Sequence, residues 1–311
     1  MEQVLAGVRV VEVAQWWLVP SAGAVLADRG ADVVEVEHPV TGDPQRGLVT
    51  SGFFPDRSRG GIAHALTPPG AAAPIMQRAA FGDSAGGMTV AGGIAAALFR
   101  RERIGAPSVV DVSLLGTAMW ILAPDIVMTR LTEQEMPVFD RTEAPNPIVN
   151  GYRTQDGRWL FLSMLQPDRF WADLCRHLGR EDLITDPRFE NGMARFMNRR
   201  ECVRELEGVF AGRTLAEWRE ALATLEGVWA PMQSAREVGD DPQAIANGYL
   251  PRIDRGDGSG FTLVASPVEF DETPSALRPA PECGQHTEEV LLSLGMTWEE
   301  LAALKESGAI S

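Results

Sequence analysis

The stretch that decides the fold is VRVVEVAQWWLVPSAGAVLADRGADVVEVEHP, residues 8–39. It begins with an apolar, β-branched run at 8–13, which predicts a strand. Apolar residues at helical spacing follow at 20–30, and a second strand pattern covers 31–39. This order of elements is typical of a βαβ unit, in which a helix connects two parallel strands. The sequence therefore predicts an α/β fold in which helices cover a parallel sheet.

A second decisive stretch is AAFGDSAGGMTVAGGIAAALFRR, residues 79–101. It predicts a helix with one apolar face, made by Met88, Ala91, Ala95 and Leu98. Four glycines interrupt it, and each costs a helix up to about 1 kcal/mol relative to alanine. We therefore expect another group to pack or bind very close to this backbone.

Between and beyond these stretches the pattern changes. Residues 47–74 are rich in Gly, Pro and Ala and predict a loop. A β-branched run predicts a strand at 109–112, followed by an N-cap at Ser113 and a buried helix. No G-x-G-x-x-G follows the first strand, so the usual nucleotide-binding fingerprint is absent.

The character of the sequence changes beyond about residue 140. A hairpin is predicted at 150–164 with its turn at 155–157. The other expected elements are helices at 167–179, 196–211 and 214–225, a strand within 260–270, a helix near Thr287 and a last helix within 297–308. Trp171, Leu174, Cys175 and Leu178 recur at i, i+3, i+4 and i+7, the spacing of a core-facing stripe.

Composition excludes several classes of protein. The 311 residues carry 28 Lys and Arg against 43 Asp and Glu, a net charge of −15, and the cations form no basic block. Nucleic acid is therefore not an expected partner. Three separated cysteines support neither a disulfide framework nor a metal site. We found no leader pattern and no long apolar segment, so we expect a cytoplasmic protein without a membrane partner.

Several co-linear segments carry a resemblance to a known family. They are GVRVVEVAQWWLVPSAGAVLADRGADVVEVEHPVTGDPQRG, FGDSAGGMTVAGGIAAALFRRERIGAPSVVDVSLL, GVWAPMQSAREVGDDPQ and APECGQHTEEVLLSLGMTWEELAALKESGAI. Together they span nearly the whole chain and resemble the family III CoA-transferases. This is the CaiB/BaiF group, which includes formyl-CoA transferase and, as a branch, α-methylacyl-CoA racemase.

The resemblance implies a fold and an assembly. A large Rossmann-like domain is formed by both chain ends, here 1–140 and 258–311, with a smaller domain inserted at 141–257. Two such chains form an interlocked homodimer. Relatives carry roughly 80 to 90 further residues where this chain has only a short loop, so we expect a missing segment near 54–59.

The resemblance also implies the site. Asp83 matches the catalytic aspartate. Coenzyme A, entering as an acyl-CoA substrate, is expected to contact residues of the loop after the first strand, the end of the second strand, and the glycine-rich helix, with no metal involved. These residues are Gln15, Trp16, Trp17, Leu18, His38, Arg46, Gly86 and Gly87.

Simpler interpretations stand beside these assignments. Asp83 is also placed to act only as a helix cap. Packing at a strand end also explains Trp16 and Trp17. Arg46 is equally well explained as a surface cation or as a residue that binds a phosphate of the coenzyme.

The chemistry of a carboxylate explains the family assignment. Asp83 can attack a thioester to form a mixed anhydride, and the released thiolate can then form an aspartyl-CoA thioester. A helix N-terminus would favour the ionised carboxylate. We expect the amides of 84–87 to stabilise the oxyanions.

Three functions fit the sequence. The first is CoA transfer from an acyl-CoA to a free carboxylic acid through Asp83. The second is a racemase reaction, which needs an acid and a base on opposite faces of the α-carbon. The third is a CoA-binding protein without catalysis.

Overall fold

A computed structural model describes residues 3–47, 62–67, 70–75, 80–254, 258–274 and 277–310. The chain divides into two compact units, which we describe separately. Unit 1 comprises residues 1–65, 75–134 and 239–311, and unit 2 comprises 66–74 and 135–238.

Unit 1 is built around the predicted βαβ unit. Strand β1 (Arg9–Glu12) is followed by helix α1 (Leu18–Asp28) and strand β2 (Asp32–Glu35). The two strands are parallel, with Val10 opposite Val33. The predicted strand, helix and strand are therefore confirmed. Among the described residues these two strands form the whole sheet, so a larger Rossmann-like sheet stays a prediction.

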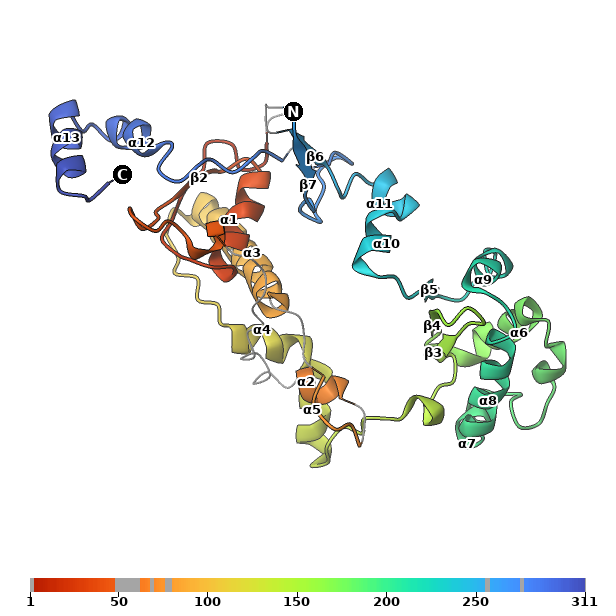
Figure 1. The fold of residues 1–311 in the computed structure, drawn as a ribbon. Helices are drawn as coiled ribbons and strands as arrows, with labels where there is room; N and C mark the ends of the chain where they lie inside the picture. Colours follow the sequence, from red (N-terminus) through yellow and green to blue (C-terminus); the bar gives the residue numbers. More distant parts are fainter. Residues whose placement is uncertain are drawn as a thin grey trace. The chain divides into compact units, whose positions relative to one another are not determined.

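Helix α3 (Phe81–Ile104) is confirmed and lies alongside α1 (Figure 1). Its predicted apolar face is confirmed at Ala91 and Leu98 but not at Met88 and Ala95. Ala91 is fully buried, and Ile94 and Leu98 pack against the same core. Met88 and Ala95 are not part of that core. The face that contacts α1 is therefore rotated relative to the predicted stripe, because the glycines determine which side α1 can approach.

The segment after α3 holds two corrections. Residues 109–112 form no strand, since the structure gives them no partner strand, and Val109 is 88% exposed. Ser113 does cap helix α4 (Leu114–Ile121), accepting a hydrogen bond from the Gly116 amide. The helix is apolar as predicted but not buried, because Trp120 is 81% exposed. Helix α5 (Ala123–Thr132) follows and has no buried residue.

The predicted loop at 47–74 is also partly wrong. It contains a short helix, α2 (Ile62–Leu66), after the 3-10 turn η1 (Pro44–Gly47). The expected gap near 54–59 lies outside the described residues.

Unit 2 contains an antiparallel sheet. Strands β3 (Val149–Arg153) and β4 (Trp159–Ser163) form the predicted hairpin, and β5 (Trp229–Pro231) pairs with β4. Gly157 has φ of 77°, the left-handed conformation that the predicted turn requires.

Unit 2 also contains helices. They are α6 (Pro167–Leu178), η3 (Glu181–Ile184), α7 (Gly192–Met197), α8 (Arg199–Phe210) and α9 (Leu215–Ala221), with η2 (Arg141–Glu143) before the hairpin and α10 (Ala235–Gly239) after β5. The helix expected at 196–211 is thus divided, because α7 ends at Met197 and α8 begins at Arg199.

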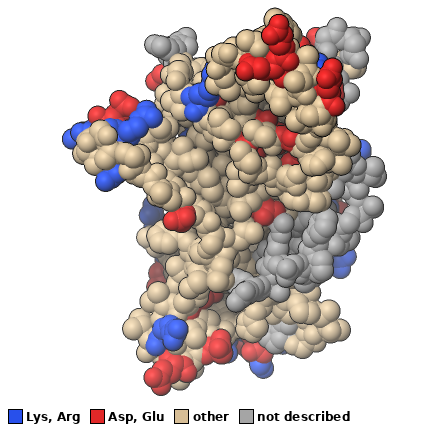
Figure 2. All heavy atoms as spheres, turned by 90° about the vertical axis from the view of Figure 1, so that its left-hand side faces the viewer, with Lys and Arg blue, Asp and Glu red and all other residues tan. Residues whose placement is uncertain are grey.

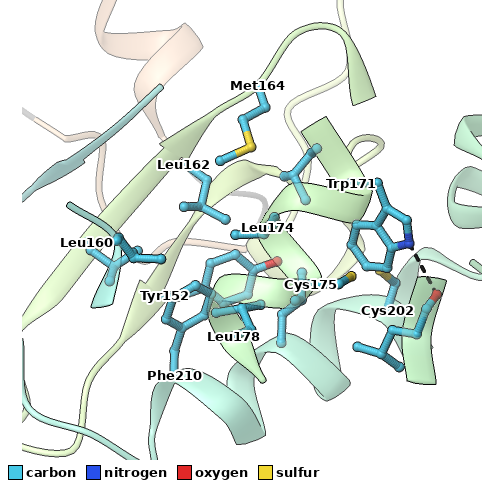
Figure 3. Packing of buried hydrophobic residues seen from close by; sticks show 14 of the residues in the cluster. Tyr152, Leu160, Leu162, Met164, Trp171, Leu174, Cys175, Leu178, Cys202 and Phe210 are labelled. Atoms are coloured by element: carbon cyan, nitrogen blue, oxygen red, sulfur yellow. Dashed lines mark hydrogen bonds between the residues drawn. The ribbon is translucent and has the colours of Figure 1, made fainter. Parts of the chain in front are cut away.

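The core of unit 2 confirms the predicted stripe. Trp171, Leu174, Cys175 and Leu178 are all buried, and Figure 3 shows them among the other side chains of this core. The indole N–H of Trp171 donates to the carbonyl of Leu183 at 3.1 Å. These side chains therefore serve packing.

The rest of unit 1 comes from the C-terminal part of the chain. It contains α11 (Pro242–Ala246), β6 (Arg252–Asp254), β7 (Gly260–Thr262), α12 (Thr287–Ser293) and α13 (Trp298–Glu306). The helix start at Thr287 is as predicted, and Thr297 and Glu300 form a capping box at α13.

Two surface properties complete the description. On the face shown in Figure 2, the described Lys and Arg side chains lie apart, with Asp and Glu between them. Within the described ranges, no single helix is long and apolar enough to cross a membrane. Only α4 and α5 taken together meet that criterion, and they are bent by 73° at their junction.

Candidate active site

Asp83 is the third residue of α3 and is only 4% exposed. The helix N-cap is Ala80, whose φ is 67° and whose side chain makes no capping bond. The interpretation of Asp83 as the cap is therefore wrong. The structure instead buries a carboxylate in the first turn of a helix, where the helix dipole favours negative charge.

Gly86 and Gly87 lie on the buried side of α3, against α1. A Cβ atom on Gly87 would overlap the hydroxyl of Ser21 and lie 2.8 Å from the backbone oxygen of Leu18. A Cβ atom on Gly86 would overlap the side chain of Leu18. Helix packing therefore explains both glycines, and α1 is the group that was expected close to this backbone.

The loop after β1 reaches the same helix turn. Trp17 is the N-cap of α1, and its indole N–H donates to the Ser84 hydroxyl at 3.0 Å. The hydroxyl of Ser21 donates to the carbonyl of Leu18 at 2.9 Å and approaches the carbonyl of Asp83 at 3.5 Å. Gln15, Trp16 and Trp17 are exposed, whereas Leu18 is half-buried. The structure thus brings this predicted loop to Asp83.

The backbone donors near Asp83 differ from those predicted. The amide of Ser84 donates to the carbonyl of Ala80 at 2.8 Å, because α3 begins at Phe81. The amides that follow it continue the same helical pattern. The amides of 84–87 are therefore engaged within the helix and are not the oxyanion donors that the sequence predicts.

His38 and Arg46 lie elsewhere in unit 1, beyond the end of β2. The His38 Nδ1 atom accepts from the amides of Val40 and Thr41. Arg46 donates to both carboxylate oxygens of Glu37 and, at 3.0 Å, to the carbonyl of Pro281. This ion pair lowers the pKa of Glu37 to about 2.

A cavity of about 770 Å³ adjoins His38 and Arg46. It is lined by β1, α1, β2 and the C-terminal segment 280–291, with 309–310. Neither Asp83 nor the loop 15–18 lines it. The predicted contacts therefore form two groups, one around Asp83 and one at this cavity.

Glu12 lines the cavity and was not anticipated from the sequence. It is 6% exposed, and its Oε1 atom has no hydrogen-bond partner among the described residues. Burial, together with the charges of Glu35 and Asp43, raises the pKa of Glu12 to about 7. The only sequence signal is an acidic residue at the end of a strand that also contains two valines.

Glu12 predicts a pH dependence of stability. Its pKa in the folded protein lies above the ordinary value of 4.5, so the folded state binds this proton more tightly. The contribution is present below pH 4.5 and is lost as the pH rises through about 7. As the pH rises from 4.5 to about 7, the unfolding free energy of Glu12→Gln should decrease less than that of the parent, as measured by chemical denaturation. The exposed control Glu102→Gln should retain the parental slope, and an unchanged slope in Glu12→Gln would contradict the assignment.

A metal centre finds no support in the part of the chain that the structure describes. No group of three or more His, Cys, Asp or Glu side chains there is arranged to hold an ion.

Comparisons with known proteins find similarity over most of the chain. The model of CoA-transferase family III matches residues 5–60 and 54–287. The two matched ranges overlap at 54–60, and the sequence analysis predicts a missing segment near 54–59.

Two curated relatives are similar over most of this chain. One is an (R)-2-hydroxy-4-methylpentanoate CoA-transferase of Clostridioides difficile, 31% identical over 81% of the chain. The other is a cinnamoyl-CoA:phenyllactate CoA-transferase of Clostridium sporogenes, 30% identical over 84% of the chain. In both cases the chain spans 63% of the relative's length.

Solved structures agree on the fold. A Mycobacterium tuberculosis protein aligns with a TM-score of 0.75 at 22% identity, over 91% of this chain and 98% of its own. A CaiB/BaiF family protein from Brucella suis aligns with a TM-score of 0.75 at 18% identity, over 94% of this chain and 100% of its own.

Proposed function

The chain belongs to CoA-transferase family III, and on that premise we propose that it moves coenzyme A from an acyl-CoA thioester to a free carboxylic acid. The observation that carries this proposal is the buried carboxylate of Asp83 in the first turn of α3, beside the loop that follows β1.

The proposed reaction begins with attack of the Asp83 carboxylate on the thioester carbonyl. The carbon–sulfur bond breaks, CoA leaves as a thiolate, and a mixed anhydride remains. The thiolate then attacks the aspartyl carbonyl, which releases the first acid and leaves an aspartyl-CoA thioester. The acceptor carboxylate attacks this thioester, and the freed thiolate attacks the new acyl carbonyl. Acyl-CoA is formed and the Asp83 carboxylate is restored.

The local geometry supports these roles. Asp83 lies in the first turn of α3, where the helix dipole stabilises negative charge. The contact of α1 with Gly86 and Gly87 fixes α3 against the loop after β1. In this proposal the two glycines act through packing.

The coenzyme is proposed to contact the loop 15–18 near its thioester. Its nucleotide end would lie at His38 and the adjoining cavity. Arg46 can bind a phosphate there only if the phosphate replaces the carboxylate of Glu37.

A second copy of the chain is the proposed partner, as an interlocked homodimer. The apolar side chains exposed on α4 and α5 support an assembly that covers them, since single apolar residues are common on surfaces but large apolar patches are not.

A panel of substrates tests the reaction. Acetyl-CoA, cinnamoyl-CoA and 2-hydroxy-4-methylpentanoyl-CoA serve as donors, and phenyllactate, 2-hydroxy-4-methylpentanoate and oxalate serve as acceptors. We expect a new acyl-CoA to appear only when both donor and acceptor are present. The assay is liquid chromatography of the CoA esters.

The same mixtures distinguish the alternatives when they are run in D₂O. A racemase would place deuterium at the α-carbon of the acyl-CoA without an acceptor acid. A protein that only binds CoA would do neither. Either outcome would contradict the proposed transfer.

A further inference from the structure

Asp43 is a buried acidic residue that connects two loops of unit 1. It is 6% exposed and follows β2 by eight positions. Its Oδ1 atom accepts from the amide of Gln45 at 2.7 Å, and its Oδ2 atom accepts from the amide of Trp16 at 3.1 Å. The first bond is local, whereas the second crosses to the loop after β1.

The residue that Asp43 holds has an unusual backbone. Trp16 has φ of 73°, in the left-handed region. Bulky residues with a side chain rarely adopt this region, because Cβ crowds the backbone, whereas glycine adopts it freely. The hydrogen bond from the Trp16 amide to Asp43 therefore stabilises a backbone conformation that tryptophan disfavours.

The next residue carries the effect to the catalytic helix. Trp17 occupies the N-cap position of α1, and its indole donates to Ser84, the neighbour of Asp83. The direction of the chain at Trp16 thus decides whether this indole reaches the first turn of α3.

We propose that Asp43 is a positioning residue for the Asp83 site. By fixing Trp16 in the left-handed conformation, it places Trp17 against Ser84 and so sets the wall beside the reacting carboxylate. The kinetic consequence rests on the proposed function, whereas the structural connection does not.

A purely structural role makes a different prediction. Asp43 also organises its own loop, through Gln45 and through its amide, which donates to Glu37 at 2.8 Å. Loss of those bonds would cost the same whatever residue stands at position 16. The proposed role, in contrast, predicts that Asp43 matters less when the residue at position 16 adopts the left-handed conformation without the bond to Asp43.

A double-mutant cycle separates the two roles. The four proteins are the parent, Asp43→Ala, Trp16→Gly and the double variant. We expect Asp43→Ala to lower kcat/KM about 10- to 100-fold in the parent, as small displacements at active sites do. In the Trp16→Gly background the same substitution should lower it less than about 3-fold, because glycine takes the left-handed conformation unaided. Equal losses in both backgrounds would overturn the proposal.

Two controls accompany the cycle. Asp240→Ala removes an exposed aspartate of the same unit that does not line the cavity, and should leave kcat/KM unchanged. If Asp43→Ala does not fold, Asp43→Asn replaces it in the cycle, since the amide oxygen keeps one acceptor.

A second readout does not depend on turnover. The indole N–H resonance of Trp17, assigned by its loss in Trp17→Phe, is followed in a ¹⁵N spectrum. It should shift and exchange faster with D₂O in Asp43→Ala and return to the Trp16→Gly position in the double variant. An indole resonance that Asp43→Ala leaves unchanged would overturn the proposal. If the parent shows no transfer with any substrate, the proposed function fails while this measurement still decides the role of Asp43.

Discussion

The Asp83→Asn variant is expected to lose CoA transfer by at least about 10⁴-fold, the scale seen when a nucleophile is removed from an enzyme. An amide has nearly the size and shape of the carboxylate but does not attack a thioester. Because asparagine has nearly the shape of aspartate, the substitution should leave the packing around this buried position unchanged. Initial rates with the best donor and acceptor pair measure the loss.

The chain offers a matched control for this substitution. Asp125 is the third residue of α5, as Asp83 is the third residue of α3. Asp125→Asn therefore makes the same chemical change at the same helical position and should keep the parental rate. Since asparagine can deamidate back to aspartate, Asp83→Ala should repeat the loss. A residual rate of a few per cent in both Asp83 variants would remove this residue from the mechanism.

The Gly87→Ala variant is expected to lose about 1–3 kcal/mol of unfolding free energy, the usual cost of inserting a methyl group into a tight contact. The new Cβ atom would lie 2.8 Å from the backbone oxygen of Leu18, which cannot rotate away. The helices would have to separate, and the bond from Trp17 to Ser84 would lengthen. Both the melting temperature and the transfer rate should therefore fall.

Gly92→Ala is the control in the same helix. A Cβ atom there meets nothing within 4 Å. Alanine should stabilise α3 by up to about 1 kcal/mol through its higher helix propensity. If both alanine variants changed stability in the same direction, close packing would not be the reason for Gly87.

The βαβ unit could be predicted because its information is local. β-branched runs, helical spacing and a closing glycine lie within residues 8–39, and the structure places β1, α1 and β2 there. The hairpin of unit 2 is equally local, since Gly157 supplies the positive φ of its turn. The strand predicted at 109–112 failed because a strand needs a partner, and periodicity does not reveal one.

The same distinction applies to the candidate site. Asp83 and the loop 15–18 were found through the resemblance to a family, and the structure brings Trp17 to Ser84. Glu12 and Asp43 gave no comparable signal, because their interest arises from burial. An acidic residue in a strand or loop is ordinarily exposed. Only the packed structure shows that these two carboxylates are covered.

The family and the fold of the chain are established by the comparisons, whereas its reaction is proposed. The chain belongs to CoA-transferase family III, and its fold aligns with solved structures over at least 91% of its length. The reaction at Asp83 is a proposal that depends on one covalent intermediate.

Mass mapping of that intermediate tests the account most directly. The protein is mixed with acyl-CoA without acceptor, quenched in acid, digested and analysed by mass spectrometry, with and without hydroxylamine. The account predicts coenzyme A attached to the peptide that contains Asp83, removed by hydroxylamine and absent in Asp83→Asn. Coenzyme attached to a different residue, or to none during measurable transfer, would contradict it.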